Sequence, residues 1–378
     1  MSPRVLHVSE ANEWTGGTAQ LLLLAEGLKA KGWEIVVGCR PGSGLSVHCE
    51  KRGLETFTVG LREDYDLLSA FELARFVMSR GIDVIHAHHN RSHACCLLAQ
   101  GILAARGERR VLVVSRRVSF PPGKNPFSRW KYRSSLIDRI VAVADAVKEV
   151  LVAAGVPPSR VAVIRSGVDL AKFAPRRAGD AEKKRLGLPA GVPLIGKIAN
   201  ASPWKGQAVL LEAAALMAKA GARAHFAFAG RDTDGPWMRG EVERLGLKDR
   251  VTLLGFRTDV PDILSALDLS VNAAVKGEGL SGALHESLTM GLPVVASDIA
   301  GNRELLVAGA GGWLYPPGDA AALAERLTWA LAHPAETKAA VTAWQTKAQS
   351  EFTLDQTITR TDALYRELLT ARRDARPS

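Results

Sequence analysis

Short apolar runs that alternate with helix-like segments constrain the fold of this chain more than any other feature. In the first half, the runs at residues 4–9, 34–38 and 83–85 are rich in β-branched residues, and segments with helical spacing separate them. Continuous apolar runs of this kind are typical of strands that helices cover on both faces. The alternation therefore predicts a doubly wound, parallel α/β sheet, which binds ligands beyond the carboxyl ends of its strands.

The same alternation begins again at residue 194, after a stretch rich in proline and glycine at 188–193. A chain of 378 residues is also too long for one ordinary core. We therefore expect two Rossmann-like domains that face each other across a cleft. The expected parts are a first domain at 1–170, a linker at 171–192 and a second domain at 193–378, whose last helix has the option of packing back on the first domain.

Segments that would direct the chain into a membrane or out of the cell are not expected. The N-terminus runs directly into an apolar strand without the pattern of a signal peptide, and the longest apolar run, residues 94–105, is too short to span a bilayer. The four cysteines form neither a Cys-x-x-Cys pair nor a secreted disulfide framework. These patterns favour a reducing cytoplasm.

Most of the net charge of +10 comes from one basic segment. Residues 106–139 contain ten lysines and arginines but only two acidic residues, Glu108 and Asp138. An anionic partner would explain this excess, whether it is a membrane surface, a phosphorylated lipid or a nucleic acid. The alternative is an ordinary solvated face with a few cations at helix ends.

Two glutamates give the strongest indication of function. Glu278 and Glu286 are eight positions apart, so they would not share one face of a helix. We place Glu278 on a glycine-flanked loop and Glu286 inside a helix that begins near Ser281. The free N–H groups and the dipole at the start of this helix form an anion site, while carboxylates bind vicinal hydroxyls. The arrangement suits a ligand with sugar, phosphate and ribose in sequence; two solvated glutamates on a surface helix are the alternative.

Loops after the first strand of each domain can approach a phosphate. Gly16 and Gly17 leave the backbone free for such an approach, although a tight turn explains them equally well. Lys205 stands where a helix dipole repels a cation, which favours an anion-binding role. The acids at 232–234 and the histidines at 86–89 are more typical of a turn and of a polar loop than of metal ligands. No metal site is therefore predicted.

The chain resembles the retaining glycosyltransferases of family 4 with the GT-B fold along nearly its whole length, and in particular those that build bacterial lipopolysaccharide and polysaccharide. The most specific match is Glu278-x7-Glu286, which continues into Gly-Leu-Pro-Val-Val-Ala at 291–296. Supporting matches are Gly16-Gly17, residues 83–88, residues 163–169 and Lys205-Gly206.

The resemblance implies a role for each matching residue. Glu278 would hold hydroxyls of the donor sugar, Glu286 would hold the ribose, and Lys205 would neutralise the departing diphosphate. Further contacts with the sugar, phosphates and base would come from Gly279, Leu280, Ser281, Gly16, Gly17, Asn200, Phe256 and Arg257. Neither a cofactor nor an essential metal would be needed, because the nucleotide sugar is itself a substrate.

Two departures from the family pattern matter. Where the family often has an arginine before the lysine, this chain has Asn200, which donates a hydrogen bond but carries no charge, and Lys197 is a candidate to compensate. Where many members have an active-site histidine, this chain has Arg117. His88 and His93 are the candidates to replace that histidine, and we take His88 as the catalytic one.

The resemblance further implies retaining transfer of a hexosyl or heptosyl group, with the leaving phosphate helping to deprotonate the acceptor hydroxyl. The basic segment at 106–139 suggests that the acceptor is an anionic glycan or lipid-linked glycan, and it gives the option of peripheral contact with the anionic inner face of the membrane. We expect a cytoplasmic enzyme without a nucleic-acid partner. A sugar-phosphate synthase of the same fold, with a soluble acceptor, is the main alternative. A nucleotide-dependent oxidoreductase would need a Gly-x-Gly-x-x-Gly loop that neither first strand carries, and a nucleic-acid-binding protein would leave the paired glutamates unexplained.

Overall fold

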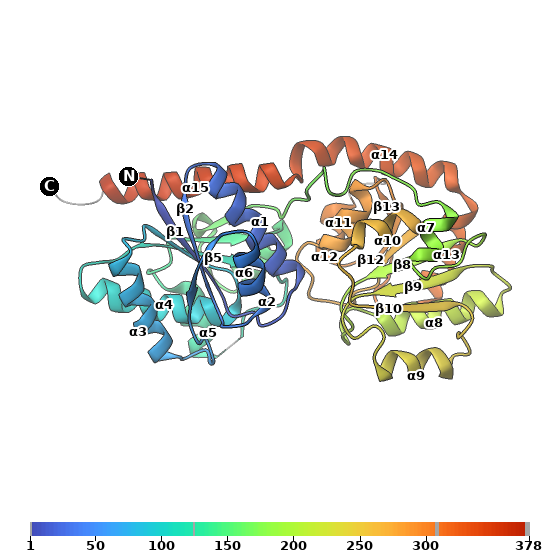
Figure 1. The fold of residues 1–378 in the computed structure, drawn as a ribbon, viewed down its shortest axis with the longest axis horizontal. Coiled ribbons are helices and arrows are strands. Elements are labelled where there is room, and N and C mark those ends of the chain that lie inside the picture. The colour runs from blue at the N-terminus through green and yellow to red at the C-terminus, as the bar shows by residue number, and fades with distance from the viewer. Residues whose placement is uncertain (1, 124, 307–309, 375–378) are drawn as a thin grey trace. The chain divides into compact units, whose positions relative to one another are not determined.

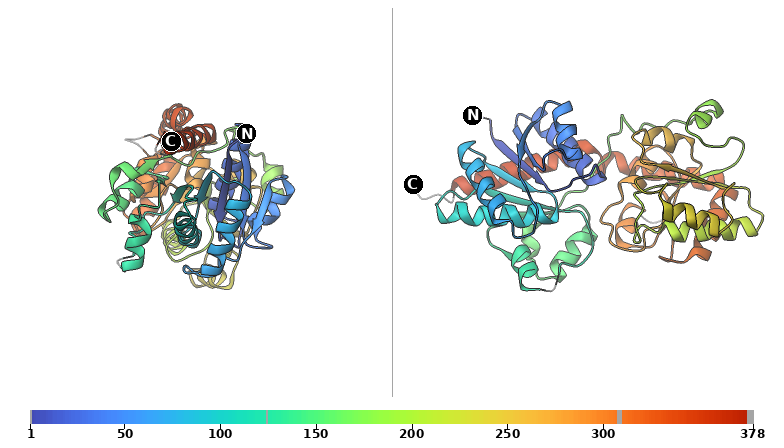
Figure 2. Two further views of the ribbon diagram at one scale, coloured as in Figure 1. Left: turned by 90° about the vertical axis from the view of Figure 1, so that its left-hand side faces the viewer. Right: turned by 60° about the horizontal axis from the view of Figure 1, so that its bottom comes forward.

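The computed structural model describes residues 2–123, 125–306 and 310–374 (Figure 1). The chain divides into two compact units, of which the first contains Met1–Gly167 and Leu354–Ser378 and the second contains Val168–Thr353. Helices cover both faces of the sheet in each unit (Figure 2). The predicted α/β class with two doubly wound parallel sheets is confirmed. Within the described ranges, no helix is long and apolar enough to cross a membrane.

A seven-stranded parallel sheet with the order β3-β2-β1-β4-β5-β6-β7 forms the centre of the first unit. Its strands are β1 (Arg4–Ser9), β2 (Glu34–Cys39), β3 (Glu55–Thr58), β4 (Val84–Ala87), β5 (Val111–Arg116), β6 (Arg139–Ala142) and β7 (Val161–Val163). Its α-helices are α1 (Gly16–Ala30), α2 (Gly44–Lys51), α3 (Leu67–Ser79), α4 (Asn90–Ala105), α5 (Pro126–Arg133), α6 (Asp145–Ala153) and α15 (Leu354–Asp374). The strand order reverses between β1 and β4, and loops that follow these two strands lie at the same edge.

The C-terminal helix α15 completes the core of the first unit. Ile358, Leu364 and Tyr365 belong to the same buried cluster as residues from α1 and β2. Trp33 Nε1 donates a hydrogen bond to Asp362 Oδ1 at 2.7 Å. A glycine is required at position 27 of α1, because a Cβ there would lie 2.1 Å from the Ile358 side chain. The close approach of α1 to α15 therefore depends on this glycine.

The second unit contains a six-stranded parallel sheet with the order β10-β9-β8-β11-β12-β13. Its strands are β8 (Leu194–Ile198), β9 (His225–Ala229), β10 (Val251–Gly255), β11 (Leu269–Asn272), β12 (Val294–Ser297) and β13 (Gly312–Tyr315). Its helices are α7 (Asp180–Arg185), α8 (Gln207–Lys219), α9 (Pro236–Arg244), α10 (Val260–Ala266), α11 (Gly282–Thr289), α12 (Ala300–Leu305), α13 (Ala320–Ala332) and α14 (Pro334–Glu351). Here the order reverses between β8 and β11.

The structure divides the chain differently from the expected boundaries. Residues 171–192, expected to be a linker, belong to the second unit because Phe173, Leu186 and Leu188 pack into its core beside Ile263. The last helix, α15, packs in the first unit, which is the option stated for it, although the second domain was drawn as 193–378. The apolar side chains of each segment, rather than its place in the sequence, decide which core it joins.

Residues that are common in turns begin two helices of the structure. Helix α5 starts at Pro126, and the Asn125 side chain before it accepts a hydrogen bond from Ser128 N at 2.7 Å. Residues 300–302 form the first turn of α12. The strand expected at 83–85 extends through His86 to Ala87. Caps and prolines that look like turn formers in the sequence here begin helices.

Candidate functional site

The loops that follow β8 and β11 meet at the point where the strand order of the second unit reverses. Lys205 Nζ donates a hydrogen bond to Glu278 Oε1, and Asn272 Nδ2 donates one to Glu278 Oε2 at 2.6 Å. Glu278 is 7% exposed. Burial alone would raise the pKa of its carboxyl, but Lys205, Asn272 and Lys197 outweigh burial and lower the pKa. The structure thus brings two predicted site residues, Lys205 and Glu278, into direct contact as ions.

A glycine holds this contact in place. Gly206 has a left-handed backbone (φ 74°) and stands directly before α8. A Cβ at this position would lie 1.8 Å from the carbonyl oxygen of Ala273, which follows β11. Only glycine permits that approach, which seats Lys205 against the loop that carries Glu278. Lys205 Nζ also lies 4.2 Å from the centroid of the Trp204 ring, within the range of a cation–π contact.

The helix α11 begins where it was expected. Ser281 is its N-cap, and its side chain accepts a hydrogen bond from Leu284 N at 3.4 Å. Gly279 and Leu280 lie between Glu278 and this cap, and the carbonyl of Gly279 packs so closely on Gly301 that a Cβ there would lie 1.9 Å away. The predicted anion-binding backbone is therefore held at the positive end of a helix, beside a carboxylate and an ammonium.

Glu286 is the fifth residue of α11 and is half-buried. Burial raises the pKa of its carboxyl to about 7, an effect that Lys172 partly opposes. A carboxylate that is costly to ionise without a ligand suits a partner with hydroxyl donors. This arrangement agrees with the split placement of the two glutamates, one on a loop and one in a helix.

Three other predicted donor contacts lie on neighbouring loops. Asn200 Oδ1 accepts a hydrogen bond from Arg231 N at 3.0 Å, so the amide is tied to its own unit. Phe256 is exposed after β10, and the Arg257 guanidinium forms an ion pair with Asp259. The structure places these residues at the same edge of the sheet as Lys205, since they follow the parallel strands β8 and β10.

In the first unit, the glycine loop lies beside a cation and a histidine. Gly16 opens α1, and a Cβ on it would meet no atom within 4 Å. A Cβ on Gly17 would lie 3.1 Å from His89 Nε2 and 3.7 Å from Arg117 Cδ. His89 Nδ1 shares a hydrogen bond with Ser9 Oγ at 2.9 Å. The carboxyl ends of β1, β4 and β5 thus gather Gly17, His89 and Arg117.

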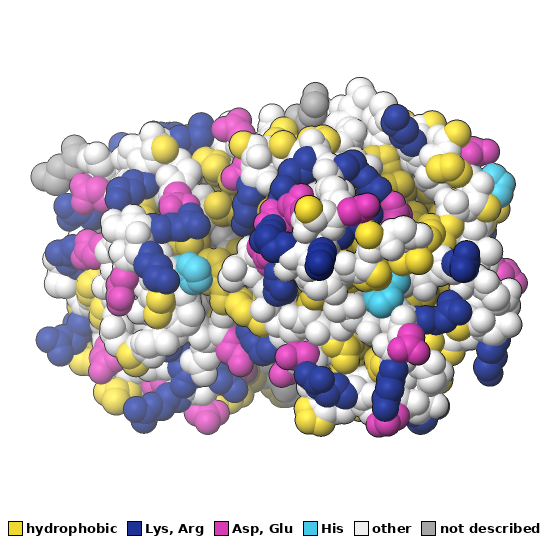
Figure 3. Space-filling model, turned by 45° about the vertical axis from the view of Figure 1, so that its right-hand side comes forward, with side chains coloured by type: hydrophobic (Ala, Val, Ile, Leu, Met, Phe, Trp, Pro, Cys, Tyr) yellow, Lys and Arg dark blue, Asp and Glu magenta, His cyan; other side chains and the backbone are white. Residues whose placement is uncertain are grey.

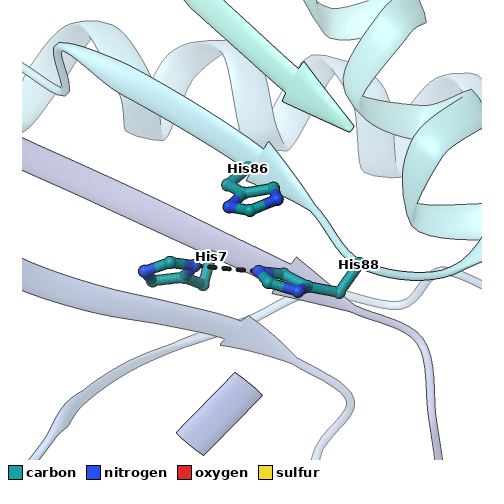
Figure 4. Close-up of side chains that lie close together, drawn as sticks. All are labelled: His7, His86 and His88. Atoms are coloured by element: carbon teal, nitrogen blue, oxygen red, sulfur yellow. Dashed lines mark hydrogen bonds between the residues drawn. The ribbon is translucent and has the colours of Figure 1, made fainter. Parts of the chain in front are cut away.

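Three buried histidines lie beneath this edge (Figure 4). His7 Nδ1 and His88 Nε2 share a hydrogen bond of 2.9 Å. His86 Nε2 lies 2.8 Å from Ser115 Oγ, and its Nδ1 contacts the Tyr365 hydroxyl. One nitrogen of each ring lies within 4.8 Å of the others, a grouping with the spacing of metal ligands. Burial lowers the pKa of each ring, that of His7 to about 3, so all three are neutral near pH 7.

Arg117 is the cation of this edge. Its guanidinium donates to Ser166 Oγ at 3.1 Å and lies 3.4 Å from His88 Nδ1, while burial lowers its pKa to about 10. No carboxylate among the described residues pairs with it. It lines a cavity of about 20 Å³ with His86, Ser115 and Ser166. A half-buried arginine without a carboxylate partner is a candidate to bind an anion.

The prediction that His88 contacts a substrate directly does not agree with its position in the structure. The side chain is 1% exposed and lies between His7 and Arg117. His88 can therefore influence the edge at the carboxyl ends of the strands only through its contact with Arg117. His93, the other candidate, is buried against Tyr132.

Sequence reasoning missed four residues that shape these sites: His7, Ser115, Asn272 and Asn302. His7 and Asn272 had one available signal, because each is a polar residue in an otherwise apolar strand.

Comparisons with known proteins are consistent across the chain. A model described as Glycosyltransferase Family 4 matches residues 14–172, and one described as Glycosyl transferases group 1 matches residues 192–333. WcaL of Salmonella typhimurium, named for glycosyl transfer in colanic acid biosynthesis, is 31% identical over 200 residues, which are 50% of this chain and 47% of that protein. The chain thus spans about half the length of the curated relatives first matched.

Longer alignments include the lipopolysaccharide core biosynthesis mannosyltransferase LpcC of Rhizobium leguminosarum, which is 28% identical over 84% of this chain and 88% of that protein. Among solved structures, Anabaena HepE in complex with UDP has a TM-score of 0.81 at 21% identity, covering 96% of this chain and 100% of that one. A glycosyltransferase from Rickettsia africae has a TM-score of 0.85 at 19% identity, covering 97% and 99%. These structural likenesses show the fold.

Glu286→Gln should remove part of the pH dependence of stability. Because the folded-state pKa of Glu286 is raised above its ordinary 4.5, its neutral form contributes stability that is complete below pH 4.5 and is lost as pH rises through about 7. From this group, wild type should lose about 1 kcal/mol of unfolding free energy between about pH 6 and about pH 8. Urea unfolding at both pH values measures the loss, and Glu325→Gln on the exposed face of α13 is the control. An equal loss in the Glu286 variant would contradict a raised pKa of the Glu286 carboxyl.

Proposed function

We propose that this chain transfers a sugar from a nucleotide-diphosphate sugar to a glycan or lipid-linked acceptor in the assembly of cell-surface polysaccharide. The premise is that the chain belongs to the glycosyltransferases of family 4 and group 1. The observation that carries the proposal is the contact of Lys205 with Glu278 at the start of α11. A cation, a helix N-terminus and a hydroxyl-binding carboxylate at one point match the three chemical parts of such a donor.

In this proposal the second unit binds the donor. Lys205 and the N-terminal end of α11 stabilise the negative charge that grows on the diphosphate as the glycosidic bond breaks. Glu278 orients the sugar through its hydroxyls, and Glu286 accepts hydrogen bonds from the ribose. Transfer with retention follows if the acceptor enters on the face from which the diphosphate leaves, where a phosphate oxygen takes the acceptor's proton. The relative HepE supports this choice of donor, because it was solved with UDP.

The first unit then binds the acceptor. Arg117 supplies a cation without a carboxylate partner, and it lies beside His89 and Gly17, which we expected to contact the donor. Such an edge suits an acceptor with a phosphate or carboxylate group. His88 is a positioning residue for Arg117 in this scheme, because it is buried beneath the guanidinium. A relative named as a galactosyltransferase acting on a diphosphoundecaprenol acceptor supports a lipid-linked, anionic acceptor.

Lys205→Met should weaken the binding of nucleoside diphosphates. Loss of one charge-assisted contact corresponds to about ten- to a hundredfold in affinity. Titration calorimetry with UDP, GDP and ADP measures this and also identifies the base. Lys248→Met removes an exposed lysine of the same unit and is the control. Equal affinities for wild type and the Lys205 variant would take Lys205 out of the donor site.

We further propose that transfer requires no metal ion. Lys205 and the helix end already supply positive charge at the diphosphate. The three clustered histidines make hydrogen bonds with one another, Ser115 and Tyr365, and the Arg117 guanidinium beside them opposes a further cation. EDTA should therefore leave the rate of sugar transfer unchanged. Activity that is lost with EDTA and restored by magnesium or manganese would contradict this proposal.

The basic segment at 106–139 carries less free charge than its composition suggests. Arg109 pairs with Asp138, Arg110 with Glu108 and Arg139 with Glu367. Lys131 is 3% exposed and donates to Asn90 Oδ1 at 2.6 Å, and Lys124 lies outside the described residues. Figure 3 shows one face of the molecule, on which lysines and arginines are interspersed with aspartates and glutamates. A purely electrostatic membrane contact is therefore less favoured than the sequence indicated.

Aromatic and aliphatic side chains of the first unit offer a different membrane contact. The rings of Tyr65 and Phe127 lie 4.1 Å apart, and Trp130 lies 5.4 Å from Phe127 on the exposed side of α5. Leu67 and Leu68 at the start of α3 are 66% and 70% exposed. Exposed Arg129 lies on the same helix. We propose that this surface, the α3–α5 apolar surface, touches the inner face of the cytoplasmic membrane.

The double variant Leu68→Ser/Trp130→Ser should lose most of its co-sedimentation with vesicles that contain anionic lipid, because apolar insertion rather than charge provides the contact. Salt should weaken wild-type binding only moderately. Leu216→Ser, which removes an exposed leucine of the second unit, is the control. Binding that the double variant retains in full, or that wild type lacks at low salt, would refute the membrane contact.

A further inference from the structure

A buried lysine without a hydrogen-bond partner lies behind the donor site. Lys197 is the fourth residue of β8, in the middle of the sheet, and is 2% exposed. Among the described residues, none accepts a hydrogen bond from its ammonium group. Burial lowers its pKa to about 7; Lys205 adds to this effect and Glu278 opposes it. Because burying an ammonium group without a partner is unfavourable for folding, the presence of a lysine in a central strand requires an explanation.

Two charged groups act on Lys197. Glu278 and Lys205 are the two that influence it, and they already pair with each other. The helices α8 and α13 cover the face of the sheet on which Ile195 lies, two residues from Lys197, and their core contacts are apolar. The charged residues of these helices are exposed: Glu212, Lys219, Glu325 and Arg326. Glu278 is therefore the carboxylate that acts on both Lys197 and Lys205, and it accepts a hydrogen bond from Lys205.

A phosphate that approaches this site competes with Glu278 for Lys205. The loop from Ala199 to Gly206 contains no other cation, and the Asn200 carboxamide is held by Arg231 N. When Lys205 turns to the phosphate, its ammonium group leaves Glu278, while Asn272 Nδ2 still donates a hydrogen bond to that carboxylate. A cation from the adjacent strand β8 would then stabilise the buried carboxylate.

We propose that Lys197 is the second cation of the donor site, and that it takes over the pairing with Glu278 when Lys205 binds the diphosphate. This inference rests on the proposed function, because it needs a diphosphate ligand. Lys197 takes up a proton from solvent as the ligand binds, and the exchange keeps Glu278 ionised and able to orient the sugar. In this proposal Lys197 contributes to ligand binding at the expense of the stability of the fold, which explains why it has no hydrogen-bond partner before the ligand binds.

Calorimetry with UDP at about pH 8 tests the exchange. At this pH the UDP phosphate, whose pKa is about 6, and Glu286 are ionised, so Lys197 dominates any proton uptake. Titrations in Tris and in HEPES, which differ in ionisation enthalpy, should show net proton uptake by wild type. Lys197→Met should abolish this uptake and weaken UDP binding about ten- to a hundredfold. Lys219→Met, at the exposed end of α8, should change neither.

A second readout separates this role from a structural one. Lys197→Met removes a buried amine that makes no hydrogen bond, so its melting temperature without UDP should rise, while the further rise caused by UDP should shrink. If this variant does not fold, Lys197→Gln carries the same measurements. Wild-type affinity together with wild-type proton uptake in a folded variant would overturn the role of Lys197 and leave the donor site intact. Failure of wild type to bind UDP, GDP and ADP would instead reject the donor site itself, and this inference with it.

Discussion

The contact between Lys205 and Glu278 depends on two backbone features that come from different strands. Gly206 lets the loop after β8 approach the carbonyl of Ala273, and Asn272 at the end of β11 fixes the second carboxylate oxygen. Neighbouring parallel strands bring both loops to one edge, so the sheet positions the two ions before any ligand is present. The start of α11 adds its dipole at the same point. Everything proposed for the donor follows from this single meeting of two loops.

The sequence was sufficient where one residue pattern determines the structure. Apolar runs identified the central strands, and the spacing of Glu278 and Glu286 placed one on a loop and the other in a helix that begins at Ser281. The sequence was insufficient where a residue type is common in two kinds of local structure, such as a turn and a helix cap. Asn125 and Pro126 resemble a turn but cap α5, because the next residues can form an amphipathic turn against Tyr65. Contacts between distant segments, such as His7 with His88, leave no local pattern at all.

Charge was the least reliable sequence signal. A count of lysines and arginines in residues 106–139 does not show that Glu367, more than two hundred positions later, neutralises Arg139. Nor does it show that Lys131 and Arg116 are buried in hydrogen-bonded positions, where they support the fold rather than face a partner. The cations with functional interest are instead the buried Lys197 and the half-buried Arg117, neither of which forms an ion pair among the described residues. Their identification needs the three-dimensional neighbours of each residue.

The packing of α15 into the first unit affects how the chain can be made. Ile358, Leu364 and Tyr365 complete the core around Trp33 and the sheet, yet more than three hundred residues separate them from that tryptophan in the sequence. A ribosome adds residues from the N-terminus onward, so the first unit leaves the exit tunnel well before its last helix exists. Until then the apolar groove beside α1 is open to water and to chaperones, while the second unit, which is continuous in sequence, can fold completely. The domain that is synthesised first is therefore finished last.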